Sequence, residues 1–528
     1  MSNHAYESAA ALRPSSNGPI PISTLCERFS LAPASAEDAA ALNDLSILGV
    51  SVDSADTAPG ELFVGLPGFT VHGARFAAQA VASGAVAVLT DADGAQIVHQ
   101  TAPGTPTLVH SDPRAVVGPL SAEVYHHPAR GLVTTAVTGT NGKTTTAYFL
   151  DAILSAHVGG CMVAGTVELR VGERSVESPR TTVEAPVLQR MMALAVEDKV
   201  GAASLEASSH AIVLHRLDGI VVDVAGFTNL QRDHLDFHKT MEGYLEAKAQ
   251  LFTPEHARRG VVCVDDQWGA ALAAEAPIEI DRVRAYPGDT PADWWVSDAA
   301  VSLTDSATTF TLHGPDGEQI EASCPLPGLV NVQNAALALV MAIRAGVPAA
   351  TATTALAGAH NIPGRMQRIS QRDGRRGLCI VDFAHTPEAM ELALKAVRPI
   401  TPGRLIVVFG SDGDRDQGKR PMLGEVCARL ADVLVVTDEN PRSEDPQLIR
   451  NAILEGVRGV RPDLTDVEEI TTWRGDAVRR GVELCGPDDT VIVTGKGHEP
   501  FLEMAGEFIR YNDAPVMAEA VEEKWGRA

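Results

Sequence analysis

The sequence predicts an α/β protein of three domains: a small N-terminal α/β unit, a central P-loop domain with a largely parallel sheet, and a C-terminal Rossmann-like domain. Three observations lead to this fold class. Short apolar runs alternate with helical segments, which is typical of parallel sheets covered by helices. A glycine-rich loop directly follows the strong apolar run that begins at Leu132. Each of four later apolar runs ends in a polar loop.

The length of 528 residues supports this division, because domains average roughly 150 residues. We place the boundaries at residues 1–128, 129–362 and 363–528. Residues 1–20 carry Ser, Asn, Pro and Gly without periodicity, so we expect a mobile tail. In the first domain, Gly60–Gly68 and Ala85–Asp91 read as short strands.

The central domain begins with the run LVTTAVTG, followed by a loop and the helical segment TTTAYFLDAIL. Further buried strands are expected at Ala203–Ala207, Val221–Phe227 and Gly260–Asp266. A Pro-Gly-Arg turn at Pro363–Arg365 opens the third domain. Its four strands are expected in LCIVDFAH, RLIVVFGSDGD, DVLVVTDENPR and TVIVTGKGHE. Ligands bind at the carboxyl ends of strands in open parallel sheets, so these polar endings predict a ligand-facing edge.

Composition excludes several functional classes. The apolar fraction of 45% and the charged fraction of 21% are those of a folded globular protein. With 43 Lys+Arg against 68 Asp+Glu, the net charge of −25 gives no basic footprint for nucleic acid. The apolar helical stretch Ala335–Val347 is too short to span a bilayer and contains Arg344, so no membrane association is expected.

The seven cysteines lie far apart and their number is odd, which argues against a disulfide framework or a zinc ribbon. The N-terminal residues show no basic start followed by an apolar run, as a signal peptide would. We therefore expect a cytoplasmic protein.

The loop Gly139-Thr140-Asn141-Gly142-Lys143-Thr144 predicts a phosphate site. A strand, a glycine turn and a helix N-terminus direct backbone N–H groups toward one point, and Lys143 adds a full positive charge. Thr144 places a hydroxyl where it can bind Mg²⁺. A full Walker A motif would have Gly at position 137, where this chain has Val, so an ordinary turn is the alternative.

Glu206 and His234 follow the next expected strands. Either residue alone would more often be a surface loop side chain. Together with Thr144, they place oxygen and imidazole groups at three strand ends, which suits a divalent cation beside phosphates.

Lys248 falls within an apolar stripe at helical spacing, seven residues after Met241 and three before Leu251. The ordinary interpretation is a lysine that extends to water. If it is enclosed, burial lowers its pKa and leaves a neutral amine. Such an amine can take up CO₂ and become a metal-binding carbamate.

These residues belong to an ordered set of segments, which are GTNGKTT, EASSH, FTNLQRDHLDFH, YLEAK, NVQNAALA, GRMQ and VDFAHTP. Together the set resembles the Mur ligase family, in particular its MurE type. The resemblance runs from Val52–Gly68 to Gly495–Glu499 and so covers nearly the whole chain.

The resemblance implies ATP-dependent amide-bond formation through an acyl phosphate. It implies that Lys143 holds the phosphates, and that two Mg²⁺ are held by Thr144, Glu206, His234 and a carbamate on Lys248, with Lys143, His234 and Lys248 as catalytic residues. The implied nucleotide-binding residues are Gly139, Thr140, Asn141, Gly142, Lys143, Thr144, Thr145, Asn334, Arg365 and Asp382.

The resemblance also implies a nucleotide-sugar peptide as one substrate. The implied contacts are Val52, Ser54, Phe69, Thr70, Val71 and Gly73 at the uridine end, and Thr181, Thr182, Ser208 and Arg216 at the sugar and peptide end. Three neighbours depart from the family pattern: Ala55 stands where Arg is frequent, Val183 where Pro is common, and Leu214 where Gln is found. Each of these departures affects a single contact with the substrate, and not the predicted class of substrate.

The segment DENPRSEDP resembles the diaminopimelate recognition motif of the family. Diaminopimelate has one more carboxylate than lysine, and Arg442 can pair with it through two charge-assisted hydrogen bonds. Glu439 stands where the motif has Asp. The residues implied for this amino acid are Arg415, Glu439, Asn440, Pro441, Arg442, Gly495 and Glu499.

Other readings remain open: a lysine-adding MurE-type ligase, a folylpolyglutamate synthase, a P-loop NTPase switch, and a binding module without catalysis. A folate enzyme is expected to lack the Val52–Gly73 region and the ENPR segment. A switch protein would hydrolyse its nucleotide without an amine. The expected partners are small-molecule substrates, and a monomer is expected.

Overall fold

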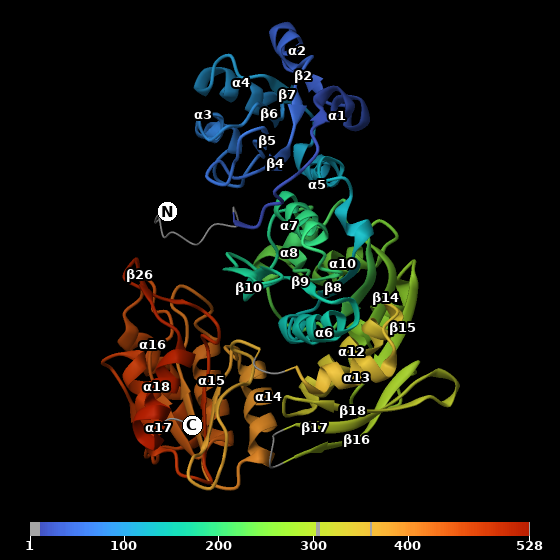
Figure 1. Cartoon of the computed structure of the whole chain (residues 1–528). Helices are drawn as coiled ribbons and strands as arrows, with labels where there is room; N and C mark the ends of the chain where they lie inside the picture. The colour runs from blue at the N-terminus through green and yellow to red at the C-terminus, as the bar shows by residue number, and fades with distance from the viewer. Residues whose placement is uncertain (1–10, 303–306, 360–361, 527–528) are drawn as a thin grey trace. The chain divides into compact units, whose positions relative to one another are not determined.

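The computed structural model of the chain describes residues 11–302, 307–359 and 362–526. The chain divides into two compact units. One unit contains Met1–Trp295 and Ala336–Ala355, and the other contains Val296–Ala335 and Leu356–Ala528. The structure confirms the predicted α/β class, because helices alternate with strands in each unit (Figure 1).

The N-terminal sheet has five strands, drawn in blue in Figure 1. Their order is β2 (Ala32–Pro33), β7 (Thr107–Val109), β6 (Ala87–Thr90), β5 (Glu61–Val64) and β4 (Gly49–Ser51). Helices α1 (Ile22–Phe29), α2 (Ala36–Leu42), α3 (Ala77–Ala82), α4 (Ala92–Thr101) and α5 (Pro113–Val124) accompany it, and β1 (Ile20–Pro21) pairs with β3 (Ser46–Ile47). The expected strands at residues 60–68 and 85–91 correspond to β5 and β6.

The expected free tail is wrong from Leu12 onward, while residues 1–10 lie outside the described residues. Leu12 is fully buried within the apolar core of the central domain. Arg13 pairs with Asp56 and Glu61, and Ser15 Oγ donates to Glu197 Oε1 at 2.6 Å. Sequence periodicity did not predict this, because single anchoring residues hold the segment without any helix or strand.

The central sheet has eleven strands. Its middle is parallel, in the order β9 (Cys161–Ala164), β12 (Ala202–Glu206), β8 (Val133–Thr138), β13 (Val222–Phe227), β14 (Ala257–Cys263) and β15 (Glu279–Arg284). The carboxyl ends of β8, β12 and β13 therefore meet at one edge. Helix α6 (Lys143–Val158) is flanked by the caps Gly142 and Gly159, and Gly159 takes the left-handed conformation that glycine favours.

Strands that the sequence did not predict extend both ends of this sheet. On one side, β10 (Glu168–Val171) pairs with β9 and with β11 (Arg174–Glu177). On the other side lie β16 (Trp294–Val301), β17 (Thr308–His313) and β18 (Gln319–Cys324), and of these β16 is parallel to its neighbour β15. The remaining helices of this region are α7 (Ala185–Glu197), α8 (Ser209–Val213), α9 (Leu235–His238), α10 (Met241–Ala249), α11 (Gln267–Glu275), α12 (Leu329–Arg344) and α13 (Ala349–Ala357).

The C-terminal sheet has six strands, in the order β19 (Gln367–Ser370), β20 (Leu378–Val381), β24 (Thr490–Val493), β21 (Leu405–Phe409), β22 (Val433–Val436) and β23 (Val467–Glu469). All pairs except β19–β20 are parallel. Helices α14 (Pro387–Val397), α15 (Lys419–Leu430), α16 (Pro446–Val460), α17 (Arg474–Leu484) and α18 (Asp513–Trp525) belong to it, with the hairpin β25 (Phe501–Met504) and β26 (Glu507–Arg510). The four expected strands are β20, β21, β22 and β24.

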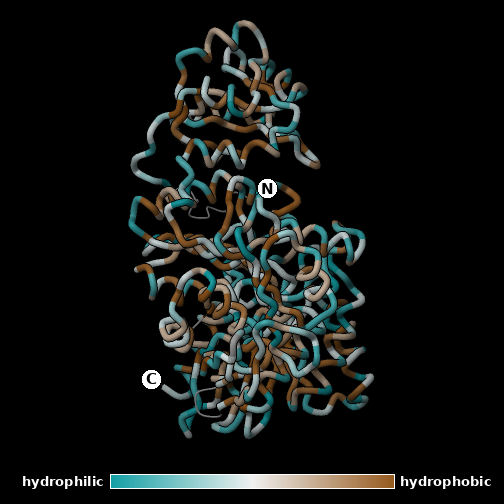
Figure 2. The backbone as a smooth tube through the Cα atoms, turned by 90° about the vertical axis from the view of Figure 1, so that its right-hand side faces the viewer, coloured by the Kyte–Doolittle hydropathy of each residue, from teal (hydrophilic) through white to brown (hydrophobic). Residues whose placement is uncertain are grey.

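Apolar and polar stretches alternate along the backbone (Figure 2). The strands of the C-terminal sheet illustrate this, since β21, β22 and β24 are buried over their whole length and lead into polar loops. Within the described ranges, no helix is both long and apolar enough to cross a membrane.

Candidate active site

The phosphate-type loop lies between β8 and α6, as the sequence predicts. Gly139 has φ 146°, and a Cβ there would lie 1.9 Å from Thr228 Oγ1, so the position leaves no room for a side chain. The loop is held by Asn229: Thr140 N donates to its carbonyl oxygen at 2.9 Å, and Asn141 N donates to its Oδ1 at 3.0 Å. The positive end of the α6 dipole thus lies at this loop, an arrangement that favours anions.

Two lysines meet at this loop. Lys143 Nζ donates to the carbonyl oxygens of Gly139 and Thr140 at 3.0 and 2.9 Å. Lys248 Nζ, from α10, donates to the same Gly139 oxygen at 2.8 Å. Lys248 lies 4.5 Å above the Tyr244 ring and is 1% exposed, so it does not reach water. Burial, followed by the charge of Lys143, holds the pKa of Lys248 well below its usual value.

Glu206 is buried at the end of β12 and accepts three hydrogen bonds. Thr144 Oγ1 donates to its Oε2 at 3.0 Å, Thr166 Oγ1 donates to the same oxygen at 2.9 Å, and Thr166 N donates to its Oε1 at 2.8 Å. A hydroxyl and a carboxylate of this kind are hard oxygen ligands. Two of the four predicted metal ligands, Thr144 and Glu206, are therefore in direct contact.

Across the described ranges 11–302, 307–359 and 362–526, no group of three or more His, Cys, Asp or Glu side chains is placed to hold a metal ion. Mg²⁺ is usually held by one or two carboxylates together with phosphate oxygens and water. The Thr144–Glu206 pair, at the end of the phosphate-type loop, fits that ligand set.

His234 lies among other ring side chains. Its ring centroid is 4.8 Å from that of His210 and 6.1 Å from that of Tyr244. It is half-exposed, and the charges of Lys143 and Lys248 act on it. His238 stacks on Tyr244 and contacts Ser209 Oγ at 2.8 Å. The sequence interpretation omitted His210 and His238, although both stand within segments that carried the family resemblance.

The residues predicted at the sugar and peptide end of the substrate come together beside Glu206. Thr182 Oγ1 donates to the Glu206 carbonyl oxygen at 2.7 Å, and Ser208 N donates to Thr182 Oγ1 at 3.0 Å. Arg216 donates to the Thr182 carbonyl oxygen at 3.2 Å and pairs with Glu184 at 3.0 Å. Thr181 completes this group, since Thr166 Oγ1 donates to its hydroxyl at 3.2 Å.

The residues predicted at the uridine end form a separate group in the N-terminal sheet. Val52 and Ser54 follow β4, and the Ser54 hydroxyl donates to Gln79 at 3.0 Å. The loop of Phe69, Thr70, Val71 and Gly73 lies after β5. Phe69 is 88% exposed, so its ring lies on the surface of this unit.

The predicted amino-acid residues gather at the carboxyl ends of β22 and β24. Asn440 Nδ2 donates to Glu499 Oε2 at 3.1 Å. Arg442 lies between two carboxylates, with Asp412 at 3.9 Å and Glu503 at 3.7 Å. Its φ of 54° is left-handed, and a bridge to Met504 on β25 fixes its backbone. Pro441 lies between Asn440 and Arg442, and Arg415 lies on an exposed loop after β21.

Glu439 is enclosed in this group, against Gly495, where a Cβ would lie 2.4 Å from Glu439 Oε2. Burial, reinforced by the charge of Asp412, raises the pKa of Glu439 to about 8. The extra methylene that distinguishes this residue from Asp is thus accommodated by packing against glycine.

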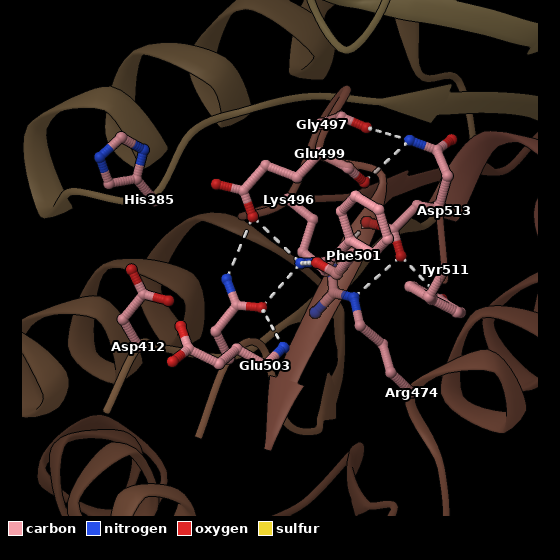
Figure 3. A network of polar contacts seen from close by, with 12 residues as sticks. His385, Asp412, Arg474, Lys496, Gly497, Glu499, Phe501, Glu503, Tyr511 and Asp513 are labelled. Atoms are coloured by element: carbon pink, nitrogen blue, oxygen red, sulfur yellow. Dashed lines mark hydrogen bonds and ion pairs between the residues drawn. The ribbon is translucent and has the colours of Figure 1, made fainter. Parts of the chain in front are cut away.

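A charged network outside the predicted set supports the same strand ends. Arg474 is fully buried and pairs with Asp513 at 2.8 Å (Figure 3). It also donates to the carbonyl oxygens of Asp438 and Thr494 at 2.9 and 2.7 Å. These contacts fix the positions at which β22 and β24 lead into their polar loops.

The three further residues predicted for the nucleotide lie in the second compact unit. Asn334 is buried in α12. Asp382 accepts from the backbone N–H groups of Met366 and Ala384 at 2.7 and 2.9 Å, and burial raises its pKa. The Arg365 guanidinium lies over the Phe383 ring at 4.4 Å.

Comparison with known families matches three segments of the chain. The Mur ligase family catalytic domain matches residues 46–123, the Mur ligase middle domain matches residues 137–342, and the Mur ligase glutamate ligase domain matches residues 364–497. The three matches cover most of the chain and follow the order of the three predicted domains.

Two relatives align over almost their whole length. A protein of Streptomyces coelicolor named UDP-N-acetylmuramoyl-L-alanyl-D-glutamate–2,6-diaminopimelate ligase is 42% identical over 91% of this chain and 93% of its own. One of Leifsonia xyli named UDP-N-acetylmuramyl-tripeptide synthetase is 42% identical over 95% and 96%. A solved structure titled as a UDP-N-acetylmuramoyl-L-alanyl-D-glutamate–2,6-diaminopimelate ligase has a TM-score of 0.63 and 31% identity, covering 90% of this chain and 95% of its own.

Proposed function

The chain belongs to the Mur ligase family, and from this premise we propose that it adds meso-diaminopimelate to UDP-N-acetylmuramoyl-L-Ala-D-Glu with cleavage of ATP. The product would be a precursor of peptidoglycan. The observation that carries the proposal is the group of Asn440, Arg442 and Glu499 at one strand edge, in a chain 42% identical to a relative named for this reaction.

The reaction joins a carboxylate to an amine. The substrate carboxylate attacks the γ-phosphate of ATP to give an acyl phosphate, the amine attacks the acyl carbon through a tetrahedral intermediate, and phosphate leaves. Two anions must approach each other in the first step. We propose that Lys143 and the N-terminus of α6 hold the triphosphate and offset its charge.

Mg²⁺ held by Thr144 and Glu206 would offset further negative charge between carboxylate and phosphate. Lys248 is enclosed and its pKa is lowered, so its amine is available for carbamate formation with CO₂. His234, close to both lysines, would orient or hold a second ion with that carbamate. Beside Glu206, Thr182, Ser208 and Arg216 would place the glutamate carboxylate of the substrate.

Arg442 is proposed to select the amine donor. Its guanidinium can pair with the second carboxylate of diaminopimelate, and a lysine substrate would leave that charge without this partner. In the structure its neighbours Asp412 and Glu503 lie at 3.9 and 3.7 Å, longer than a tight ion pair. A substrate carboxylate can therefore take the closer position.

The second candidate is a MurE-type ligase that adds lysine or another diamino acid. One relative's name leaves the amino acid unspecified, and Glu439 departs from the motif of the diaminopimelate enzymes. A folylpolyglutamate synthase or a P-loop NTPase switch would leave the group around Asn440 and Arg442 without a role.

We also propose a monomer that acts in the cytoplasm, with domain boundaries at residues 128 and 362. Each matched segment falls within one proposed domain. All seven cysteines are free thiols, which suits a reducing compartment.

The test is phosphate release from ATP in the presence of UDP-N-acetylmuramoyl-L-Ala-D-Glu, with either meso-diaminopimelate or L-lysine as the amine. Release only with diaminopimelate is expected. Release with lysine alone would keep the ligase and overturn the role of Arg442. Equal release without any amine would favour an NTPase.

A further inference from the structure

Lys496 is a lysine on the loop after β24 that the reaction outlined above does not use. It is completely buried, and its ammonium group has three acceptors (Figure 3). These are Asn440 Oδ1 at 2.8 Å, Glu499 Oε2 at 3.0 Å and the Phe501 carbonyl oxygen at 2.6 Å. An ammonium group has three donors and no acceptor, so this set satisfies it completely.

The ammonium group determines how Asn440 is turned. An amide can face a cation only with its oxygen, so Asn440 Oδ1 must point to Lys496. The amide nitrogen then points to Glu499, and donates to its Oε2 at 3.1 Å. Without the Lys496 ammonium group, the Asn440 amide could rotate so that its oxygen and nitrogen exchange places. The nitrogen, a hydrogen-bond donor, would then stand where the oxygen now accepts.

The same amide oxygen also anchors the hairpin of β25 and β26, which pairs with the backbone of Arg442. Glu503 N donates to Asn440 Oδ1 at 3.2 Å. Arg442 N donates in turn to the Glu503 carbonyl oxygen at 3.0 Å, and Ala505 N donates to the Arg442 carbonyl oxygen at 2.7 Å. These bonds hold Arg442 in its left-handed conformation, which a residue with a Cβ adopts only under constraint.

We propose that Lys496 is a positioning residue for the amine donor: its buried ammonium group fixes the orientation of Asn440 and Glu499 and, through Glu503, the backbone of Arg442. Lys496 has no hydrogen-bond donor left for a ligand, so it acts on the ligand through Asn440, Glu499 and Arg442. The inference rests on the proposed function, since it assigns Asn440, Arg442 and Glu499 to the amino acid.

The test compares the wild type with Lys496→Met, which keeps the length of the side chain and removes its charge. The KM for diaminopimelate is expected to rise about 10- to 100-fold, as for other supporting partners of a binding group, while kcat and the KM for ATP change far less. Lys496→Gln, which can still donate to Asn440 Oδ1, should recover part of the loss.

Lys524→Met is the matched control. Lys524 also has three acceptors, the carbonyl oxygens of Val482, Glu483 and Cys485 at 2.9, 2.8 and 2.5 Å, but it contacts none of the amino-acid residues. If the loss of a lysine with three acceptors only destabilises the protein, Lys496→Met and Lys524→Met will both lower kcat and leave the KM for diaminopimelate unchanged. That result would overturn the proposal.

A double-mutant cycle with Asn440→Ala gives a second readout. Because Lys496 acts largely through Asn440, Lys496→Met should add little in the Asn440→Ala background, and full additivity would contradict the proposal. If neither Lys496 variant folds, the residue supports the domain and the proposal fails. Activity of the wild type with diaminopimelate is measured first, so that failure of the proposed function is recognised separately.

Discussion

The ammonium groups of Lys143 and Lys248 share one acceptor, the Gly139 carbonyl oxygen, at 3.0 and 2.8 Å. Two cations at one oxygen repel each other, and the burial of Lys248 weakens the screening of this repulsion by water. The pKa of Lys248 is therefore lowered by its burial and by Lys143 together. This relationship makes the chemistry of the Lys248 amine depend on its surroundings.

Replacing Lys248 by Ala should nearly abolish ligation. The variant loses both the amine and the carbamate proposed on it, so added bicarbonate should not restore activity. In the wild type, depletion of CO₂ should lower the rate, and bicarbonate should restore it. Phosphate release is the measurement, with Lys395→Ala, on the exposed face of α14, as the control. Wild-type activity in Lys248→Ala would exclude the carbamate.

Glu206→Gln tests the proposed Mg²⁺ ligands. The amide keeps one oxygen for Thr166 N but has no negative charge to offer the ion, so the Mg²⁺ concentration for half-maximal rate should rise by about tenfold or more. A magnesium titration measures this shift. Glu168→Gln is the control, because Glu168 also accepts several hydrogen bonds, from Tyr148, Arg170 and Ser175. An equal shift in both variants would contradict the assignment.

Arg442→Ala should weaken the use of diaminopimelate far more than that of ATP. Loss of one partner from a hydrogen-bonded charge pair costs about 2–5 kcal/mol, so kcat/KM for diaminopimelate should fall roughly 30- to 5,000-fold. Steady-state kinetics with each substrate varied in turn measures the two effects. Arg479→Ala, an exposed arginine of α17, should change neither. Equal losses for both substrates would mean that Arg442 supports the fold.

The stability of the chain should depend on pH through Glu439. Its pKa is raised from 4.5 to about 8 in the folded state, so the folded protein holds a proton that the unfolded chain releases. Stability from this proton is present below pH 4.5 and is lost as pH rises through about 8.

The side chain of Glu439→Gln stays neutral at every pH. The difference between the melting temperature of this variant and that of the wild type should therefore increase as pH rises from 4.5 to about 8. Melting curves from pH 5 to about 9, without substrates, measure the trend. Glu425→Gln, from an exposed ion pair on α15, should show no such trend. A constant difference between Glu439→Gln and the wild type would disprove the raised pKa.

Local patterns predicted much of the fold. The strand, glycine loop and helix at Gly139–Lys143 were readable because a few consecutive residues define them. For Lys248 the helical stripe left two interpretations, a lysine that extends to water and an enclosed one, and the structure encloses it. The antiparallel strands β10, β11, β17 and β18 were missed because they are partly exposed and lack a continuous apolar run.

The parts of the site that escaped prediction depend on partners far apart in the chain. Lys496 meets Asn440 across 56 residues, and Arg474 meets Asp513 across 39. In a sequence such residues look like ordinary surface charges. Their burial follows only when the strand order is known, because neighbouring strands in the sheet are not neighbours in the sequence.

The attachment of the N-terminal segment has a consequence in time. Ser15 and its partner Glu197 are separated by 182 residues. At a synthesis rate of about 5–20 residues per second, the segment waits roughly 9–36 seconds on the ribosome before that partner exists. Leu12 remains exposed over the same interval, since the core that buries it is made later. The first part of the described chain to be synthesised thus reaches its final place only after its partners in the central domain have been made.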